Sequence, residues 1–169
     1  MAITVGEYFT DGSSGMSAAA GNTSFALYNP AATSGYIDSV QVFHTGFSET
    51  NAKICAVYSA GGGTYAVRNY VTVFSIVGNG VLITGINLYF QAGDYIGIYI
   101  PGNSWLKNLN NGHSTYYGAG DCSGGTAFTP NTDYTGYGVA LYGFSSGKKW
   151  NGITVGKWNG INPSKLNTI

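Results

Sequence analysis

Short runs of alternating apolar and polar residues, bounded by Gly, Asn, Pro and Ser, recur along most of the chain. Such alternation is typical of β-strands, because successive strand residues point to opposite faces of a sheet. In one run, Tyr95, Gly97 and Tyr99 alternate with three isoleucines. We predict strands at 3–9, 23–29, 36–45, 52–59, 64–73, 81–90, 94–100, 113–118 and 137–144.

This series of short strands predicts an all-β fold, because no window keeps a helical apolar period for ten residues. We expect an antiparallel β-sandwich over 1–147, with a jelly roll preferred and a separate C-terminal segment at 148–169. The 27 glycines and 14 tyrosines support this prediction, because Gly favours turns and Tyr favours strands.

Turn residues divide the predicted strands in two ways. The sequence YSAGGGTYAV (58–67) predicts a tight hairpin, and Asn-Gly at 79–80 predicts a second one. The polar stretches 101–112 and 119–136 are longer and predict loops. Long loops at the end of a sandwich are where binding residues usually lie.

The termini and cysteines bear on location. The first 15 residues lack the basic and apolar regions of a secretion signal, and no stretch approaches 18 apolar residues. We therefore expect synthesis in a cytoplasm and no membrane span. Cys55 and Cys122 could form one bridge, but two buried free thiols fit that location better.

Candidate catalytic groups are sparse in the sequence. His44 and His113 have no nucleophile or metal-ligand partner nearby in the sequence. Cys122 and His113 could form a nucleophile–base pair, but chance explains their presence in the same chain better. Ala-Gly-Asp at Asp94 and at Asp121 predicts turns in which the carboxylate caps backbone amides, and a calcium site would need more carboxylates. We expect no enzyme activity and no cofactor. If the protein instead cleaved glycans, the required carboxylate pair would be Asp94 and Asp121.

A sugar site is the more specific candidate. An aromatic face can stack on a pyranose ring while amides and a carboxylate bind its hydroxyls. Trp105 stands in a loop with several such groups, and the alternative is that Trp105 folds under the loop into the core. The candidate glycan-binding residues are Trp105, Asn103, Asn108, Tyr116, Tyr117 and Asp121.

The last 22 residues carry an octad repeat. Lys149-Trp150-Asn151-Gly152-Ile153 recurs at 157–161 and, in degraded form, at 165–169. Asn-Gly predicts a bend in each copy, and a lone copy cannot bury its Trp. We predict that the segment packs against another chain, although it could instead add a hairpin to its own sandwich. The predicted interface residues are Trp150, Ile153, Val155, Trp158 and Ile161.

The charges are divided between the two parts of the chain. Residues 1–147 hold three basic and seven acidic residues, whereas 148–169 holds four lysines and no acid. Four lysines over 22 residues are too dilute to indicate nucleic-acid binding, and the body has no basic patch. A solvated or interface-facing tail fits this division better.

The tandem Lys-x-Asn-Gly-Ile elements after a Gly-rich β domain resemble the ends of tailed-bacteriophage virion proteins. VYSAGGGTYAVRNYVTV (57–73) and LYFQAGDYIGIYIPG (88–102) are similar to jelly-roll modules of phage tail, fibre and capsid-surface proteins. The resemblance covers most of 36–169. It implies a virion structural protein, frequently a homotrimer, that contacts other virion proteins and in some cases a host-surface glycan, and it offers no catalytic residue.

We therefore expect a non-enzymatic virion protein, capsid-surface or tail-associated, that assembles through its C-terminal segment. A stand-alone carbohydrate-binding β-sandwich is the alternative. Such a protein would bind glycans as a monomer and would need Trp105.

Overall fold

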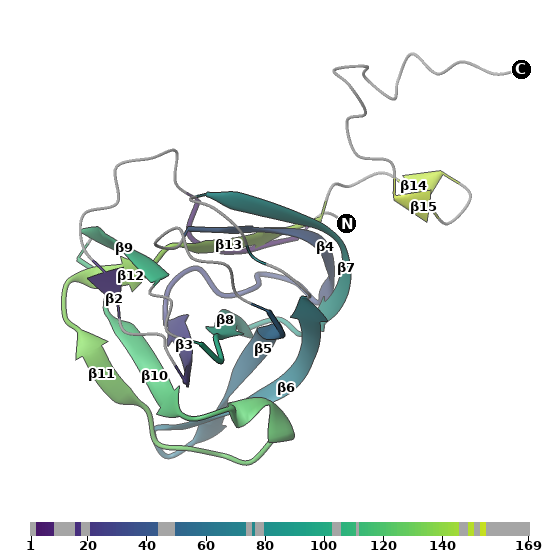
Figure 1. Ribbon diagram of the computed structural model, residues 1–169. Coiled ribbons are helices and arrows are strands. Elements are labelled where there is room, and N and C mark those ends of the chain that lie inside the picture. The colour runs from purple at the N-terminus through teal and green to yellow at the C-terminus, as the bar shows by residue number, and fades with distance from the viewer. Residues whose placement is uncertain are drawn as a thin grey trace, which may run out of the picture.

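The computed structural model is an all-β protein (Figure 1). It describes residues 3–8, 16–17, 21–43, 50–73, 76, 80–102, 106–110, 112–145, 149–150 and 153–154. Every pair of named strands is antiparallel. Among these residues no helix is long and apolar enough to span a membrane.

Two large sheets form the body. The four-stranded sheet has the order β1 (Thr4–Gly6), β13 (Leu141–Phe144), β4 (Gly35–Val42), β7 (Val81–Phe90). The six-stranded sheet has the order β11 (Asn131–Tyr134), β10 (Thr115–Ala119), β3 (Asn22–Ala26), β8 (Tyr95–Tyr99), β5 (Ala52–Gly61), β6 (Thr64–Val73). The predicted antiparallel β-sandwich is confirmed.

Two smaller sheets complete the described strands. One has the order β12 (Tyr137–Val139), β9 (Leu106–Asn110), β2 (Met16–Ser17). The other is the pair of β14 (Lys149–Trp150) and β15 (Ile153–Thr154).

The core lies between the two large sheets. Alternate residues of each strand point inward, so the apolar member of each alternating run is buried. Val40 and Leu141 of the four-stranded sheet belong to one buried cluster with Ile54 and Ile98 of the six-stranded sheet. Because each sheet buries its apolar face against the other, the opposite faces of both sheets are left for other contacts.

The sequence pattern predicted several strand boundaries. β6 and β7 begin and end at the predicted residues, and β5 and β6 form the predicted hairpin with Gly61 paired to Thr64. Gly61, Gly62 and Gly63 have φ values of 91°, 61° and 79°. Only Gly adopts this left-handed region at no steric cost, which explains the run of three.

Other predictions were wrong. The predicted strand 137–144 is divided at Ala140, whose N–H donates to Lys107 O, so that β12 pairs with β9 while β13 pairs with β4. The predicted loop 101–112 contains β9, and 119–136 contains a 3₁₀ turn, η1 (Cys122–Gly124), and β11. The second predicted hairpin fails because β6 and β7 belong to different sheets.

The first octad of the C-terminal segment forms a short strand pair. Trp150 and Ile153 are Cα partners in the β14–β15 pair. The intervening Asn-Gly, where a bend is predicted, lies outside the described residues. Val155, Trp158 and Ile161 lie outside the described residues. The packing of this segment against another chain stays a prediction.

Candidate functional site

A second apolar cluster covers part of the outer face of the six-stranded sheet. Phe25, Cys55, Val57 and Val67 are buried in it, and Phe128 packs against them from the segment that follows β10. Thr23 Oγ1 anchors this segment, because it donates to Gly120 O at 3.0 Å and accepts from Cys122 N at 3.0 Å. The segment is therefore held against the sheet.

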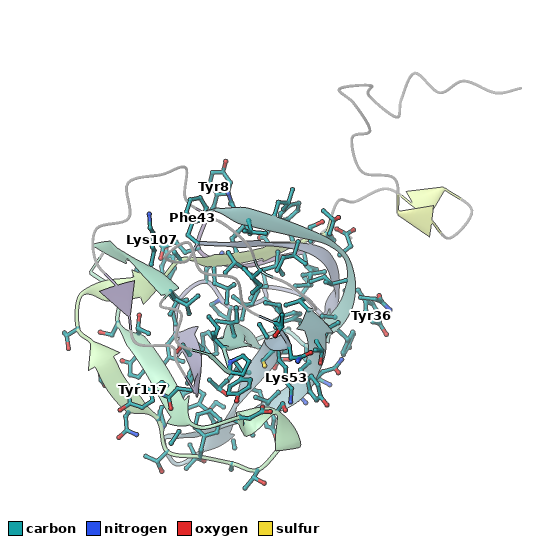
Figure 2. The ribbon with its side chains drawn as sticks, viewed as in Figure 1. Tyr8, Tyr36, Phe43, Lys53, Lys107 and Tyr117 are labelled. Atoms are coloured by element: carbon teal, nitrogen blue, oxygen red, sulfur yellow. The ribbon has the colours of Figure 1, made fainter. Side chains whose placement is uncertain are left out.

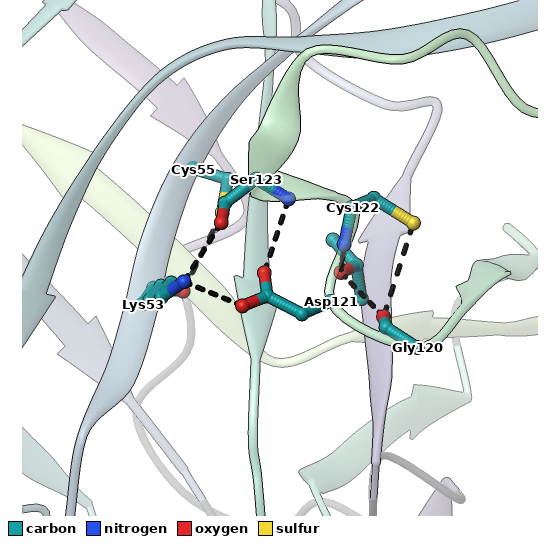
Figure 3. Close-up of polar contacts among 7 residues, drawn as sticks. Lys53, Cys55, Gly120, Asp121, Cys122 and Ser123 are labelled. Carbon is teal, nitrogen blue, oxygen red and sulfur yellow. Dashed lines mark hydrogen bonds and ion pairs between the residues drawn. The ribbon is translucent and has the colours of Figure 1, made fainter.

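Asp121 begins the η1 turn and binds a lysine of β5 (Figure 3). Its Oδ1 accepts from Ser123 N at 3.0 Å, and its Oδ2 accepts from Lys53 Nζ at 2.5 Å. Lys53 also donates to Ser123 Oγ at 2.8 Å. Partial burial acts to raise the pKa of Asp121, but the hydrogen bonds from Lys53 and Ser123 outweigh it and lower the pKa.

Two tyrosine rings flank the same lysine. Lys53 Nζ lies 4.8 Å from the centroid of Tyr70 and 5.8 Å from that of Tyr99, so cation–π attraction adds to the ion pair. The hydrogen bond to Asp121 raises the pKa of Lys53. Lysine, carboxylate, hydroxyl and half-exposed Tyr70 together can bind the hydroxyls and ring face of a polar ligand. Because its pKa is raised, Lys53 stays protonated and donates to Ser123 Oγ rather than acting as a base toward it.

The structure does not gather the predicted sugar-site residues whose positions it describes. Tyr116 and Tyr117 are consecutive on β10, so their side chains point to opposite faces of the sheet. Tyr116 packs on Phe25 at 6.2 Å between ring centroids, within the second cluster. Tyr117 lies at the periphery of the molecule (Figure 2). Asn108 belongs to β9, and Asn103 and Trp105 lie outside the described residues.

The two aspartates of the enzyme alternative are held apart. Asp94 directly precedes β8, whereas Asp121 binds Lys53, whose register partner Tyr99 is the last residue of β8. The two ends of β8, Tyr95 and Tyr99, are four residues apart, which corresponds to about 13 Å along a strand. This distance exceeds the separation of the two carboxylates in a glycosidase. Both carboxylates cap a nearby backbone amide, at Gln91 and Ser123 respectively, as the Ala-Gly-Asp turns predicted.

Other chemical groups are also separated. His113 and Cys122 lie beyond opposite ends of β10, and the His113 ring stacks on Tyr28 at 3.7 Å. Both cysteines are free thiols, as expected, but only Cys55 is buried, since Cys122 is half-exposed. Burial raises the pKa of each thiol. Within the described ranges no three His, Cys, Asp or Glu side chains lie close enough to share a metal ion.

The outer face of the four-stranded sheet is unusually aromatic. Tyr142 of β13 stands opposite Gln41, which stands opposite Leu82 of β7. Tyr8 meets Tyr142 edge-on at 5.4 Å, and Tyr142 stacks with Phe144 at 5.6 Å. We call this surface the aromatic face; its members are Tyr8, Tyr36, Leu82, Tyr89, Tyr142 and Phe144.

Several members of the aromatic face are open to solvent. Tyr8 is 63% exposed, Leu82 56% and Tyr36 53%. The solvent-facing side of an antiparallel sheet normally carries polar residues instead. Figure 2 shows Tyr8 and Tyr36 projecting away from the core. Tyr36 pairs with Tyr89 across β4 and β7 at 5.1 Å between ring centroids.

Sequence reasoning did not single out this face, although a signal was present. In 141–144, Leu-Tyr-Gly-Phe, the outward positions are Tyr142 and Phe144, where a half-buried strand normally carries polar residues. The charge of the sheet is also one-sided: Glu7 and Asp38 are the charged residues of the ranges 3–8, 35–43, 80–90 and 138–145.

The chain was compared with known proteins in three ways. No protein-family model matches it, and neither the curated proteins nor the solved structures contain a significant match.

Proposed function

We propose that the protein is a non-enzymatic structural protein of a virion, a capsid-surface or tail-associated jelly roll that assembles as a homo-oligomer. The aromatic face is the observation that carries the assembly part of this proposal. The face carries two groups of aromatic rings, Tyr8–Tyr142–Phe144 and Tyr36–Tyr89, each with one exposed tyrosine. Exposed aromatic residues on one face are typical of protein–protein contacts, which are enriched in Tyr, Trp and Phe. The location in a virion rests on the resemblance of the octad tail and the Gly-rich strands to phage virion proteins.

The strand pairing supports the jelly roll. β5 pairs with β6, β4 with β7, β3 with β8 and β1 with β13. These four pairs are nested in the chain and alternate between the two large sheets. A long antiparallel ribbon wound around one core in this way gives the two Greek keys of a jelly roll, a fold that viral capsid and lectin domains share.

The partners follow from the same proposal. The first is a second copy of the chain, in a trimer as the resemblance implies, and the next are other virion proteins. The C-terminal segment 148–169, with Trp150 and Trp158 as anchors, supplies the second assembly element, because Trp is strongly enriched among residues that dominate binding energy.

Sedimentation velocity of the purified full chain tests the proposal. We expect an oligomer, with a trimer favoured, at micromolar concentration. A monomer at every concentration measured, together with failure to join virus particles when supplied to an assembling system, would contradict it.

Carbohydrate binding is the second candidate function. The cluster of Lys53, Asp121 and Ser123 beside Tyr70 favours it, because charged and hydroxyl groups next to an exposed ring suit a polar ligand. Retention of the chain on immobilised glycans would support this function. Loss of that retention in Trp105→Ala would place the site in the predicted loop. Retention by a stable monomer would favour the stand-alone alternative over assembly.

A further inference from the structure

We infer that the aromatic face is the docking surface for the C-terminal segment (148–169) of a second copy of the chain. This inference deepens the proposed assembly function and rests on it. It names both sides of the contact: the outer face of the four-stranded sheet on one copy and the octad repeats on the other.

The first argument is chemical complementarity. The C-terminal segment alternates apolar residues, including Trp150 and Trp158, with Asn, Gly and Thr. The aromatic face presents Tyr and Phe rings beside Gln41 and Thr84 in its cross-strand rows. Aromatic side chains contribute large buried areas and favourable ring contacts, while amides and hydroxyls can satisfy exposed backbone groups of an added segment.

Charge complementarity is the second argument. The C-terminal segment has four lysines and no acid, whereas the charged residue within the four strands of the sheet, Asp38, is acidic. Glu7 follows β1 at the sheet edge, and Lys107 lies beside Phe43 at one end of the sheet (Figure 2). Charges of opposite sign favour this pairing and steer the encounter. Two aromatic faces packed on each other would instead bring together surfaces of like sign.

The position of the segment in the chain is the third argument. β13 ends at Phe144, a member of the aromatic face, and Ser145 N then donates to Ile3 O at 2.9 Å. Ser145, the last described residue of the body, therefore lies beside Ile3 near the edge of this sheet. A head-to-tail contact between the C-terminal segment and the face of the next copy, repeated around a symmetry axis, gives a closed ring.

The second copy, rather than the same chain, is the source of the segment. Tyr8, Tyr36 and Leu82 are each more than half exposed in the single full-length chain. The β14–β15 pair forms its own two-stranded sheet and shares no ladder with the described strands of the body.

The direct test is a titration with a fluorescent synthetic peptide of residues 148–169. The receptor is the full chain carrying Trp150→Ala and Trp158→Ala, whose own segment is weakened but whose aromatic face is intact. We expect saturable binding that Leu82→Lys in the same receptor weakens at least about tenfold, because it places a lysine among aromatic residues that receive a basic segment. Ala60→Lys, an exposed position of β5, is the matched control and should change binding less than about twofold.

A mixing experiment with otherwise unaltered full chains provides the second measurement. The Leu82→Lys variant has an altered aromatic face and an intact C-terminal segment. The Trp150→Ala, Trp158→Ala variant has an altered C-terminal segment and an intact aromatic face. Each should self-associate at least about tenfold more weakly than the wild-type chain, and a mixture should form a heterodimer by sedimentation. Equal melting temperatures verify that the variants are folded.

Each outcome decides a different point. If the wild-type chain oligomerises but Leu82→Lys and Ala60→Lys behave alike, the docking inference fails while the assembly proposal stands. If the tryptophan variant self-associates like the wild-type chain, the face receives something other than the segment, and the inference fails. If the wild-type chain remains a monomer and binds no peptide, both are overturned.

Discussion

Arg68 and Lys53 make the same kind of contact in different surroundings. Arg68 donates to both carboxylate oxygens of Asp94, at 2.9 and 3.2 Å, and lies 4.2 Å from the Tyr58 ring centroid. Lys53 binds Asp121 and lies near Tyr70. The Asp94 side chain is 2% exposed, whereas that of Asp121 is 34% exposed. Burial decides how much each pair contributes to stability.

Arg68→Ala should lower the free energy of unfolding by about 3 kcal/mol, because it leaves the buried carboxylate of Asp94 without its cation. Lys53→Ala is the matched control and should cost less than about 1 kcal/mol, because Asp121 remains accessible to water. Urea denaturation of both variants measures the difference. Equal losses would show that burial of the carboxylate is not what sets the value.

At the scale of elements, the segment after β10 depends on a glycine. A Cβ at Gly118 would stand 2.6 Å from both Cys122 Sγ and a ring carbon of Phe128. Gly118 therefore lets the segment 119–128 approach β10 closely enough to cover the second apolar cluster. This close approach is what brings Asp121 within reach of Lys53.

Gly118→Ala should destabilise the protein by about 2 kcal/mol, because an extra methyl group in a packed contact forces its neighbours to move. It should also speed alkylation of Cys122 by iodoacetamide, since the segment that carries this thiol is displaced. Gly124→Ala is the control, because its Cβ would meet nothing within 4 Å. Chemical denaturation and timed alkylation report the two effects. Unchanged stability and labelling in Gly118→Ala would contradict the close contact.

At the scale of the whole molecule, the described core lies between the two large sheets. The buried cluster between the large sheets consists of residues from Ile3 to Leu141. The outer surfaces differ: the six-stranded sheet is partly covered by the segment 119–128, whereas the four-stranded sheet presents the aromatic face. The proposed assembly would therefore use a sheet face that folding leaves exposed.

Deletion of residues 148–169 should leave the melting temperature nearly unchanged, within about 3 °C, at concentrations where the intact chain is monomeric. At concentrations where the intact chain is oligomeric, the truncated chain should remain a monomer. Differential scanning calorimetry and sedimentation measure the two properties. An unfolded truncated body, with the intact chain a stable monomer, would mean that the segment is the last hairpin of its own sandwich.

The sequence by itself determined the class of fold and the strands whose signal is local. Alternation and turn glycines predicted β5, β6 and β7 because the burial of a strand face and the need for positive φ are both written in neighbouring residues. The capping roles of Asp94 and Asp121 were predictable for the same reason, since each carboxylate binds an amide two or three residues away.

Only the tertiary structure decided the contacts between distant residues. β9 and β11 are short and largely polar, so no local pattern marks them; they exist because β12 and β10 supply their hydrogen bonds. Lys53 binds Asp121, which is 68 positions away in the chain. Phe128 packs against the second apolar cluster because the segment 119–128 lies against the six-stranded sheet. The aromatic face likewise joins residues of β4, β7 and β13 with Tyr8, which follows β1. The pairing of whole strands, rather than any single run, determines which residues share a surface.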